Sequence, residues 1–144
     1  MIPFFKSNQS SRNARAVVTG AGSGIGRSFA LELARRGGAV VCADINEEAV
    51  QETVTLIEEQ GGTAFAVKCD VSKAAQVRSL ASQSAKLFGA PVTLLINNAG
   101  VGVGGKIEDM TLEDWKWGVD INLWGVIHGR SEEHTSELQS PDLI

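Results

Sequence analysis

The feature that most constrains this chain is a glycine-rich segment, TGAGSGIG, at residues 19–26. It follows the apolar residues 16–18 and precedes a stretch with helical periodicity, so it predicts a turn from a strand into a helix. Glycine lets the backbone adopt positive φ and approach a ligand closely, while the first N–H groups of the helix attract an anion. The segment therefore predicts a pyrophosphate site for a dinucleotide; the alternative is a turn that binds no ligand. The residues assigned to this site are Thr19, Gly20, Gly22, Ser23, Gly24, Ile25 and Gly26.

Strand-length apolar runs alternate with helical segments along residues 15–129. The runs, at residues 15–18, 39–43, 63–69 and 92–97, are rich in Val, Ile and Leu, as in strands that helices cover on both sides. Regular alternation of strands and helices predicts a parallel sheet with right-handed crossovers. In a doubly wound α/β sheet the first four strands take the order 3-2-1-4, and a ligand binds between strands 1 and 4, where the order reverses. We expect such a sheet, truncated after about four strand–helix units.

Glycines mark the ends of the predicted helices between the strands. These three helical segments stop before Gly37, Gly61 and Gly89, because glycine readily takes the left-handed conformation that follows a helix. At the other end of the third helix, the side chain of either Asp70 or Ser72 is expected to cap the first turn.

Asp44 ends the second predicted strand, eighteen residues after Gly26. A carboxylate at this position can accept hydrogen bonds from both hydroxyls of an adenosine ribose, and its charge repels a 2′-phosphate. No Arg or Lys lies within the glycine-rich segment or just after Asp44, where a phosphate partner is expected. The pattern favours NAD over NADP as the cofactor. The alternative is an ordinary loop aspartate at a strand end.

The sequence NNAG ends the fourth predicted strand, on the other side of the first strand. It comprises Asn97, Asn98, Ala99 and Gly100. The two small residues leave room for the adenosine ribose, and the amides of Asn97 and Asn98 are predicted to connect neighbouring strand ends by hydrogen bonds. Taken alone, NNAG also fits a turn of the Asn-Gly type.

The spacing of Gly20, Gly24 and Gly26 differs from the generic G-x-G-x-x-G fingerprint, and together with NNAG it resembles the short-chain dehydrogenase/reductase family. The resemblance implies a Rossmann-like fold and an NAD(P)-dependent oxidoreductase that transfers hydride between nicotinamide and an alcohol or carbonyl substrate. It also implies that the enzyme is a homo-oligomer. In this family an aspartate and the following backbone amide contact the adenine ring, and these positions correspond to Asp70 and Val71.

A further helix is expected to begin at Thr111, which forms a capping-box pattern with Asp114. The resemblance places Asn122 on this helix as a residue that supports the active site, where its amide or the locally opened backbone holds a water of a proton relay. An exposed helix position without such a role is the alternative. The resemblance also implies a subunit interface here, whereas simple packing is the alternative for the three tryptophans of this helix, Trp115, Trp117 and Trp124.

The catalytic groups of the family are not found in this chain. The family moves the hydroxyl proton through a serine and a Tyr-x-x-x-Lys motif, and the chain contains no tyrosine. The resemblance covers residues 15–129, and residues 130–140, RSEEHTSELQS, match a translation of the start of a common sequencing-library adapter. We therefore interpret residues 130–144 as a non-native tail and expect the chain as written to be inactive. The alternative function is a dinucleotide-binding module without catalysis, because a fold does not fix an activity.

Composition argues against several other classes of protein. Thirteen basic and seventeen acidic residues give a net charge of −4, without the basic stripe that nucleic-acid binding requires. The apolar runs are far shorter than the ~20 residues that cross a membrane. Residues 1–14 are interpreted as a flexible arm. We expect a cytoplasmic protein without a metal, in which Cys42 and Cys69 are buried thiols and His128 and His134 are solvated or incidental.

Overall fold

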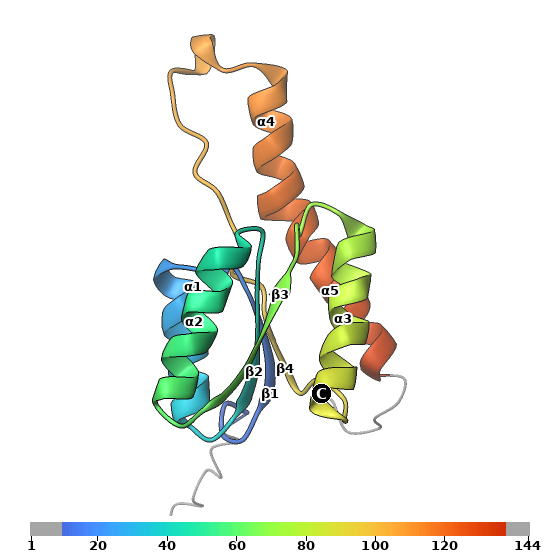
Figure 1. Cartoon of the computed structure of the whole chain (residues 1–144). Coiled ribbons are helices and arrows are strands. Elements are labelled where there is room, and N and C mark those ends of the chain that lie inside the picture. Colours follow the sequence, from blue (N-terminus) through green and yellow to red (C-terminus); the bar gives the residue numbers. More distant parts are fainter. Residues whose placement is uncertain (1–9, 138–144) are drawn as a thin grey trace, which may run out of the picture.

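A four-stranded sheet lies at the centre of the structure, which is a computed structural model that describes residues 10–137, apart from the side chains of residues 133–137 (Figure 1). Every strand pair is parallel and the order is β3-β2-β1-β4, which confirms the predicted topology. The strands are β1 (Arg15–Thr19), β2 (Ala39–Asp44), β3 (Thr63–Lys68) and β4 (Leu94–Ile96). The carboxyl ends of β1 and β4 are therefore adjacent at the point where the strand order reverses.

Helices cover both faces of the sheet, and their bounds follow the predicted pattern. On one face lie α1 (Gly24–Arg35) and α2 (Glu47–Glu59), and on the other lie α3 (Ala74–Phe88) and α5 (Gly125–Glu137) (Figure 1). Successive residues of a strand point to opposite faces. In β1, Val18 therefore packs in the core beneath α1 and α2, while Val17 packs in the core beneath α3. Each fully buried valine of this kind contributes about 1.5–3 kcal/mol relative to an exposed one.

The helix ends confirm the glycine predictions but not every predicted cap. Gly37, Gly61 and Gly89 follow α1, α2 and α3 with φ of 84°, 77° and 64°. The prediction for the start of α3 is wrong, because the residue preceding the helix is Lys73, which makes no side-chain cap. The carboxylate of Asp70, three residues before Lys73, instead accepts hydrogen bonds from the backbone N–H and the hydroxyl of Ser72.

The segment after β4 forms a short 3₁₀ turn, η1 (Ile107–Asp109), and then a continuous helical rod whose first part projects beyond the sheet (Figure 1). The rod consists of α4 (Leu112–Val119), a π-helical turn η2 (Asp120–Trp124) and α5. The side chain of Thr111 accepts a hydrogen bond from the backbone N–H of Asp114, and the Asp114 carboxylate accepts one in return, which confirms the predicted capping box. The predicted boundary between residues 129 and 130 falls within α5.

Two predicted segments lie partly outside the described residues. Of the predicted arm at residues 1–14, residues 10–14 are described and form a turn that enters β1; of the predicted tail at residues 130–144, residues 130–137 belong to α5. Within the described ranges, no helix has both the length and the apolar character that crossing a bilayer requires.

Candidate functional site

The glycine-rich segment forms the connection from β1 to α1 and leaves the first turn of α1 open. Gly20 and Gly24 have φ of 67° and 53°, values that residues with a Cβ rarely adopt. Ser23 precedes the helix and its side chain makes no capping hydrogen bond, and nothing lies within 4 Å of the position of a Cβ on Gly24. The first turn of α1 therefore has no side-chain cap, and N–H groups without intrahelical partners at a helix N-terminus are the donor set that a pyrophosphate requires.

Close packing fixes the geometry of this connection. A Cβ on Gly26 would lie 2.1 Å from the carbonyl oxygen of Gly20, and a Cβ on Gly20 would lie 2.8 Å from Cα of Ala99. Only glycine fits at either position. The connection is thus held against the end of β4, while Ile25 lies on its outer side and is 71% exposed.

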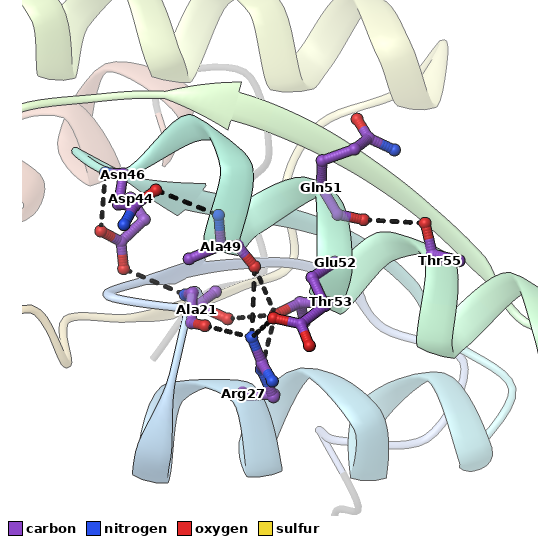
Figure 2. A network of polar contacts seen from close by, with 10 residues as sticks. Ala21, Arg27, Asp44, Asn46, Ala49, Gln51, Glu52, Thr53 and Thr55 are labelled. Carbon is purple, nitrogen blue, oxygen red and sulfur yellow. Dashed lines mark hydrogen bonds and ion pairs between the residues drawn. The ribbon is translucent and has the colours of Figure 1, made fainter.

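Asp44 lies beside the glycine-rich connection, at the carboxyl end of β2. Its Oδ2 accepts a hydrogen bond from the N–H of Gly22 at 3.0 Å, and its Oδ1 accepts one from the N–H of Asn46 at 3.0 Å (Figure 2). Because a carboxylate has about four lone-pair directions, each oxygen keeps the capacity for a further donor such as a ribose hydroxyl. Asn46 also caps α2 by accepting from the N–H of Ala49, a cap that the sequence analysis did not identify.

Asn98 connects the ends of β1 and β4, as predicted. Its Nδ2 donates to the carbonyl oxygens of Thr19, at 3.1 Å, and Gly20, at 3.4 Å. The hydroxyl of Thr19 accepts hydrogen bonds from the backbone N–H groups of Asn98 and Ala99. The corresponding prediction for Asn97 is wrong: its side chain turns toward α5, where a Cβ on Gly129 would lie 2.2 Å from its Oδ1.

The loop that follows β3 is held in place by α5. Val71 is buried, and its carbonyl oxygen lies 2.9 Å from Nδ1 of His128, which donates to it. A Cβ on Gly125 would lie 2.7 Å from the side chain of Val71, so the helix approaches the loop closely. His128 is therefore a partly buried structural contact, and the prediction that it is solvated or incidental is wrong. The side chain of His134 lies outside the described residues.

Asn122 lies in the π-helical turn and holds the chain beyond NNAG. Its Oδ1 accepts a hydrogen bond from the N–H of Val101 at 2.8 Å, and its Nδ2 donates to the carbonyl oxygen of Val101 at 2.9 Å. A Cβ on Gly100 would lie 3.2 Å from the same Oδ1. A π-helical turn opens the regular backbone hydrogen bonding, which is common at functional sites. The predicted local opening is thus present around Asn122.

The two cysteines are free and buried, which confirms the buried-thiol prediction. Burial raises the pKa of Cys42 to about 12, and burial together with the nearby charge of Asp70 raises the pKa of Cys69 to about 11. Neither side chain is a thiolate near neutral pH, so neither is a nucleophile. In the part of the chain that the structure describes, no cluster of His, Cys, Asp and Glu could hold a metal ion.

An apolar cavity of about 350 Å³ lies elsewhere, between α3, β4 and α5. Aliphatic side chains such as Val77, Leu80 and Leu95 line it, and it reaches Thr19 and Asn97. Asp44 and the turn at residues 22–26 do not line it, so the cavity is distinct from the candidate dinucleotide site.

Arg27 is a residue of this region to which the sequence analysis gave no role. It follows Gly26 directly, and its guanidinium contacts the glycine-rich connection and α2 together. The sequence signal for this contact was Thr53, a polar residue within the apolar pattern of α2, because a buried hydroxyl needs hydrogen-bond partners.

Comparison with known proteins agrees with this geometry. Residues 14–135 match the family model described as short chain dehydrogenase. The 7alpha-hydroxysteroid dehydrogenase of Escherichia coli (strain K12) is 36% identical over 128 residues, which are 89% of this chain and 47% of that protein. Cyclohexanol dehydrogenase of Acinetobacter sp. (strain SE19) is 39% identical over 122 residues, which are 84% of this chain and 48% of that protein. The chain thus spans about half the length of these relatives.

Solved structures show the same likeness. A short chain dehydrogenase/reductase from Burkholderia phymatum in complex with NAD superposes with a TM-score of 0.86 at 39% identity, covering 92% of this chain and 47% of that chain. A short chain dehydrogenase from Burkholderia cenocepacia J2315 in complex with NADP gives a TM-score of 0.81 at 31% identity, covering 88% of this chain and 51% of that chain. With its 3-2-1-4 parallel sheet and its match over residues 14–135, the chain belongs to the short-chain dehydrogenase/reductase family of NAD(P)-dependent oxidoreductases.

Proposed function

We propose that this chain is an NAD-binding domain that spans residues 15–129, from an enzyme that oxidises an alcohol or reduces a carbonyl compound. The observation that carries the proposal is a pair of features at the carboxyl ends of β1 and β2: N–H groups without a side-chain cap at the start of α1, and the fixed carboxylate of Asp44. The relatives named as hydroxysteroid and cyclohexanol dehydrogenases support an alcohol or ketone as the substrate class.

The residues have distinct tasks in this proposal. The N–H groups of Gly24, Ile25 and Gly26 donate to the pyrophosphate, where the positive end of the α1 dipole also stabilises negative charge. Asp44 accepts both hydroxyls of the adenosine ribose and disfavours a 2′-phosphate at the same place. The small residues Ala99 and Gly100 leave room for that ribose.

The adenine and the active site are assigned to the neighbouring loops. Asp70 and the N–H of Val71 contact the adenine, and the carbonyl of Val71 is already held by His128. Asn122 supports a water of the proton relay, with Val101 fixed by its amide. A bound dinucleotide would supply two-electron redox chemistry at its nicotinamide, and the residues at the glycine-rich connection, Asp44 and Val71 would hold the rest of the cofactor.

The chain as written binds the cofactor without catalysis in this proposal. The phenol that exchanges the hydroxyl proton in this family has no counterpart, because the sequence contains no tyrosine. This observation favours the second candidate function, a dinucleotide-binding module, for the chain itself. Free buried thiols support a reducing, cytoplasmic setting.

We also propose that the parent enzyme is a homo-oligomer in which the rod formed by α4, η2 and α5 takes part in the interface. Large apolar side chains are exposed along it, among them Leu112 at 87%, Leu123 at 54% and Trp117 at 51%. An exposed apolar patch of this kind is typical of an interface. Sedimentation velocity on the chain and on the variant Trp117→Glu tests this: association that the substitution abolishes supports it, and a wild-type monomer at all concentrations contradicts it.

Fluorescence titration with NADH and NADPH tests the proposed function. We expect NADH to bind and NADPH to bind more weakly, and we expect Asp44→Ala to narrow the difference because it removes the repulsive charge. Equal affinities or a preference for NADPH in the wild type would refute the assignment of Asp44, and binding of neither nucleotide would refute the proposed function.

A further inference from the structure

Arg27 connects the glycine-rich connection to α2 through several hydrogen bonds at once. Its Nη2 donates to the carbonyl oxygen of Gly22 at 2.6 Å and forms an ion pair with Glu52 at 2.7 Å, while its Nε donates to Oγ1 of Thr53 at 3.0 Å (Figure 2). The Arg27 side chain is only 24% exposed. The planar guanidinium satisfies these partners in fixed directions, which a single ammonium group could not do.

Thr53 extends this network into the core. It is fully buried, it accepts the hydrogen bond from Arg27, and its hydroxyl donates to the carbonyl oxygen of Ala21 at 2.8 Å. Two successive carbonyl groups of the connection are therefore held, that of Ala21 by Thr53 of α2 and that of Gly22 by Arg27 of α1. Figure 2 shows Arg27 and Thr53 side by side between the connection and the helix.

Gly22 transmits this constraint to Asp44. Its carbonyl group is held by Arg27, and its N–H donates to Oδ2 of Asp44 at 3.0 Å. A Cβ on Gly22 would lie 2.9 Å from that oxygen and 2.9 Å from Cβ of Ala49, so the backbone itself is packed against the carboxylate. Arg27, Gly22 and Asp44 thus form one hydrogen-bonded chain from α1 to the proposed ribose site.

We propose that Arg27 is a positioning residue that sets the preference for NAD over NADP, acting through Gly22 on the orientation of the Asp44 carboxylate. The inference rests on the proposed function. Held by the N–H groups of Gly22 and Asn46, the carboxylate keeps one acceptor direction on each oxygen for the two ribose hydroxyls. Without Arg27, Gly22 is free to move, and the carboxylate loses both its alignment with the hydroxyls and its fixed charge near the 2′ position. The affinity for NADH then falls more than the affinity for NADPH.

A double-mutant cycle tests the inference on the full 144-residue chain. NADH and NADPH are titrated by fluorescence into the wild type, Arg27→Met, Asp44→Ala and the double variant. We expect Arg27→Met to lower the ratio of the two affinities about tenfold, which corresponds to about 1.4 kcal/mol. In the Asp44→Ala background the same substitution leaves the ratio unchanged, because residues that act through one another are not additive.

Arg35→Met is the matched control, because Arg35 is on the same helix, is exposed and, among the described residues, forms its ion pair with Glu32. This variant should keep the wild-type ratio of NADH to NADPH affinity. If circular dichroism shows that Arg27→Met does not fold, Arg27→Lys replaces it, since it keeps the charge but has one nitrogen in place of the fork.

Two outcomes overturn the inference while leaving the proposed function intact. In the first, the Arg27 variant weakens NADH and NADPH by the same factor, which means that the residue is only a structural connection. In the second, the Arg27 substitution changes the ratio of NADH to NADPH affinity by the same factor in the wild type and in the Asp44→Ala background. Failure of the wild type to bind either nucleotide is a different result, because it removes the proposed function itself.

Discussion

Replacing Gly26 with alanine tests whether the close contact between α1 and the end of β1 is essential. The new Cβ would lie 2.1 Å from the carbonyl oxygen of Gly20 and 2.5 Å from Nδ2 of Asn98. Neither atom can rotate away, because the first is backbone and the second is held by two carbonyl groups. The start of α1 must therefore shift by about 1 Å, and overpacking of this kind costs about 1–3 kcal/mol.

Urea denaturation followed by circular dichroism measures this cost. The free energy of unfolding of a small protein falls with urea concentration by about 1–3 kcal/mol per molar, so the urea midpoint of the variant should fall by about 1 M. Gly104→Ala is the control, since nothing lies within 4 Å of a Cβ at Gly104 and its midpoint should stay near that of the wild type. The displaced N–H groups should also reduce NADH affinity at least tenfold, about 1.4 kcal/mol. A Gly26→Ala variant with the wild-type midpoint and wild-type affinity would refute the reasoning.

Three further substitutions or reactions probe the same structure. Asn98→Ala should destabilise the chain by about 1–3 kcal/mol, because the carbonyl oxygen of Thr19 loses a partly buried donor; an unchanged melting temperature would contradict this. Hydrogen bonds from Thr111 lower the pKa of Asp114, so its contribution to stability is present above the usual pKa of 3.8 and is lost as the pH falls through the lower value of the folded state. Asp114→Asn should remove that part of the acid dependence of unfolding, which acid titration by circular dichroism measures. Cys42 and Cys69 should react with a thiol reagent at pH 8 only after urea is added, since burial raises the pKa of both thiols; rapid labelling of the folded chain would show that they are accessible.

The strand order could be predicted because it follows from local patterns that repeat along the chain. Apolar runs such as residues 39–43 and the glycines that end α1, α2 and α3 are local signals, and parallel connections allow few topologies. The pairing of Asn98 with β1 was predicted for the same reason, since NNAG follows directly from a strand end.

The wrong predictions concern side chains that can form hydrogen bonds with more than one partner. Either Asp70 or Ser72 was expected to cap α3, but the two side chains pair with each other in the turn that precedes the helix. Asn97 and Asn98 look alike in sequence, yet they point to opposite sides of β4 because successive residues of an extended chain alternate. The contact from His128 to Val71 joins residues far apart in sequence, so no local pattern indicates it.

The role of Arg27 could not be predicted for a related reason. The partners of Arg27 come from segments before and after β2 in the sequence. Gly22 precedes that strand, whereas Glu52 and Thr53 lie on the helix that follows it. Only the packing of α1 against α2 brings them together. The structure therefore adds to the sequence mainly the network that orients the predicted site residues.

We propose above that the backbone N–H groups at the start of α1 hold the pyrophosphate of an adenine dinucleotide. Amide ¹H–¹⁵N spectra of the labelled chain during titration with NAD test it most directly. We expect the largest shifts at the amides of Gly24, Ile25 and Gly26, with smaller shifts at Asn46 and Val71. Shifts confined to residues of the apolar cavity between α3 and α5, or no shifts at millimolar NAD, would contradict it.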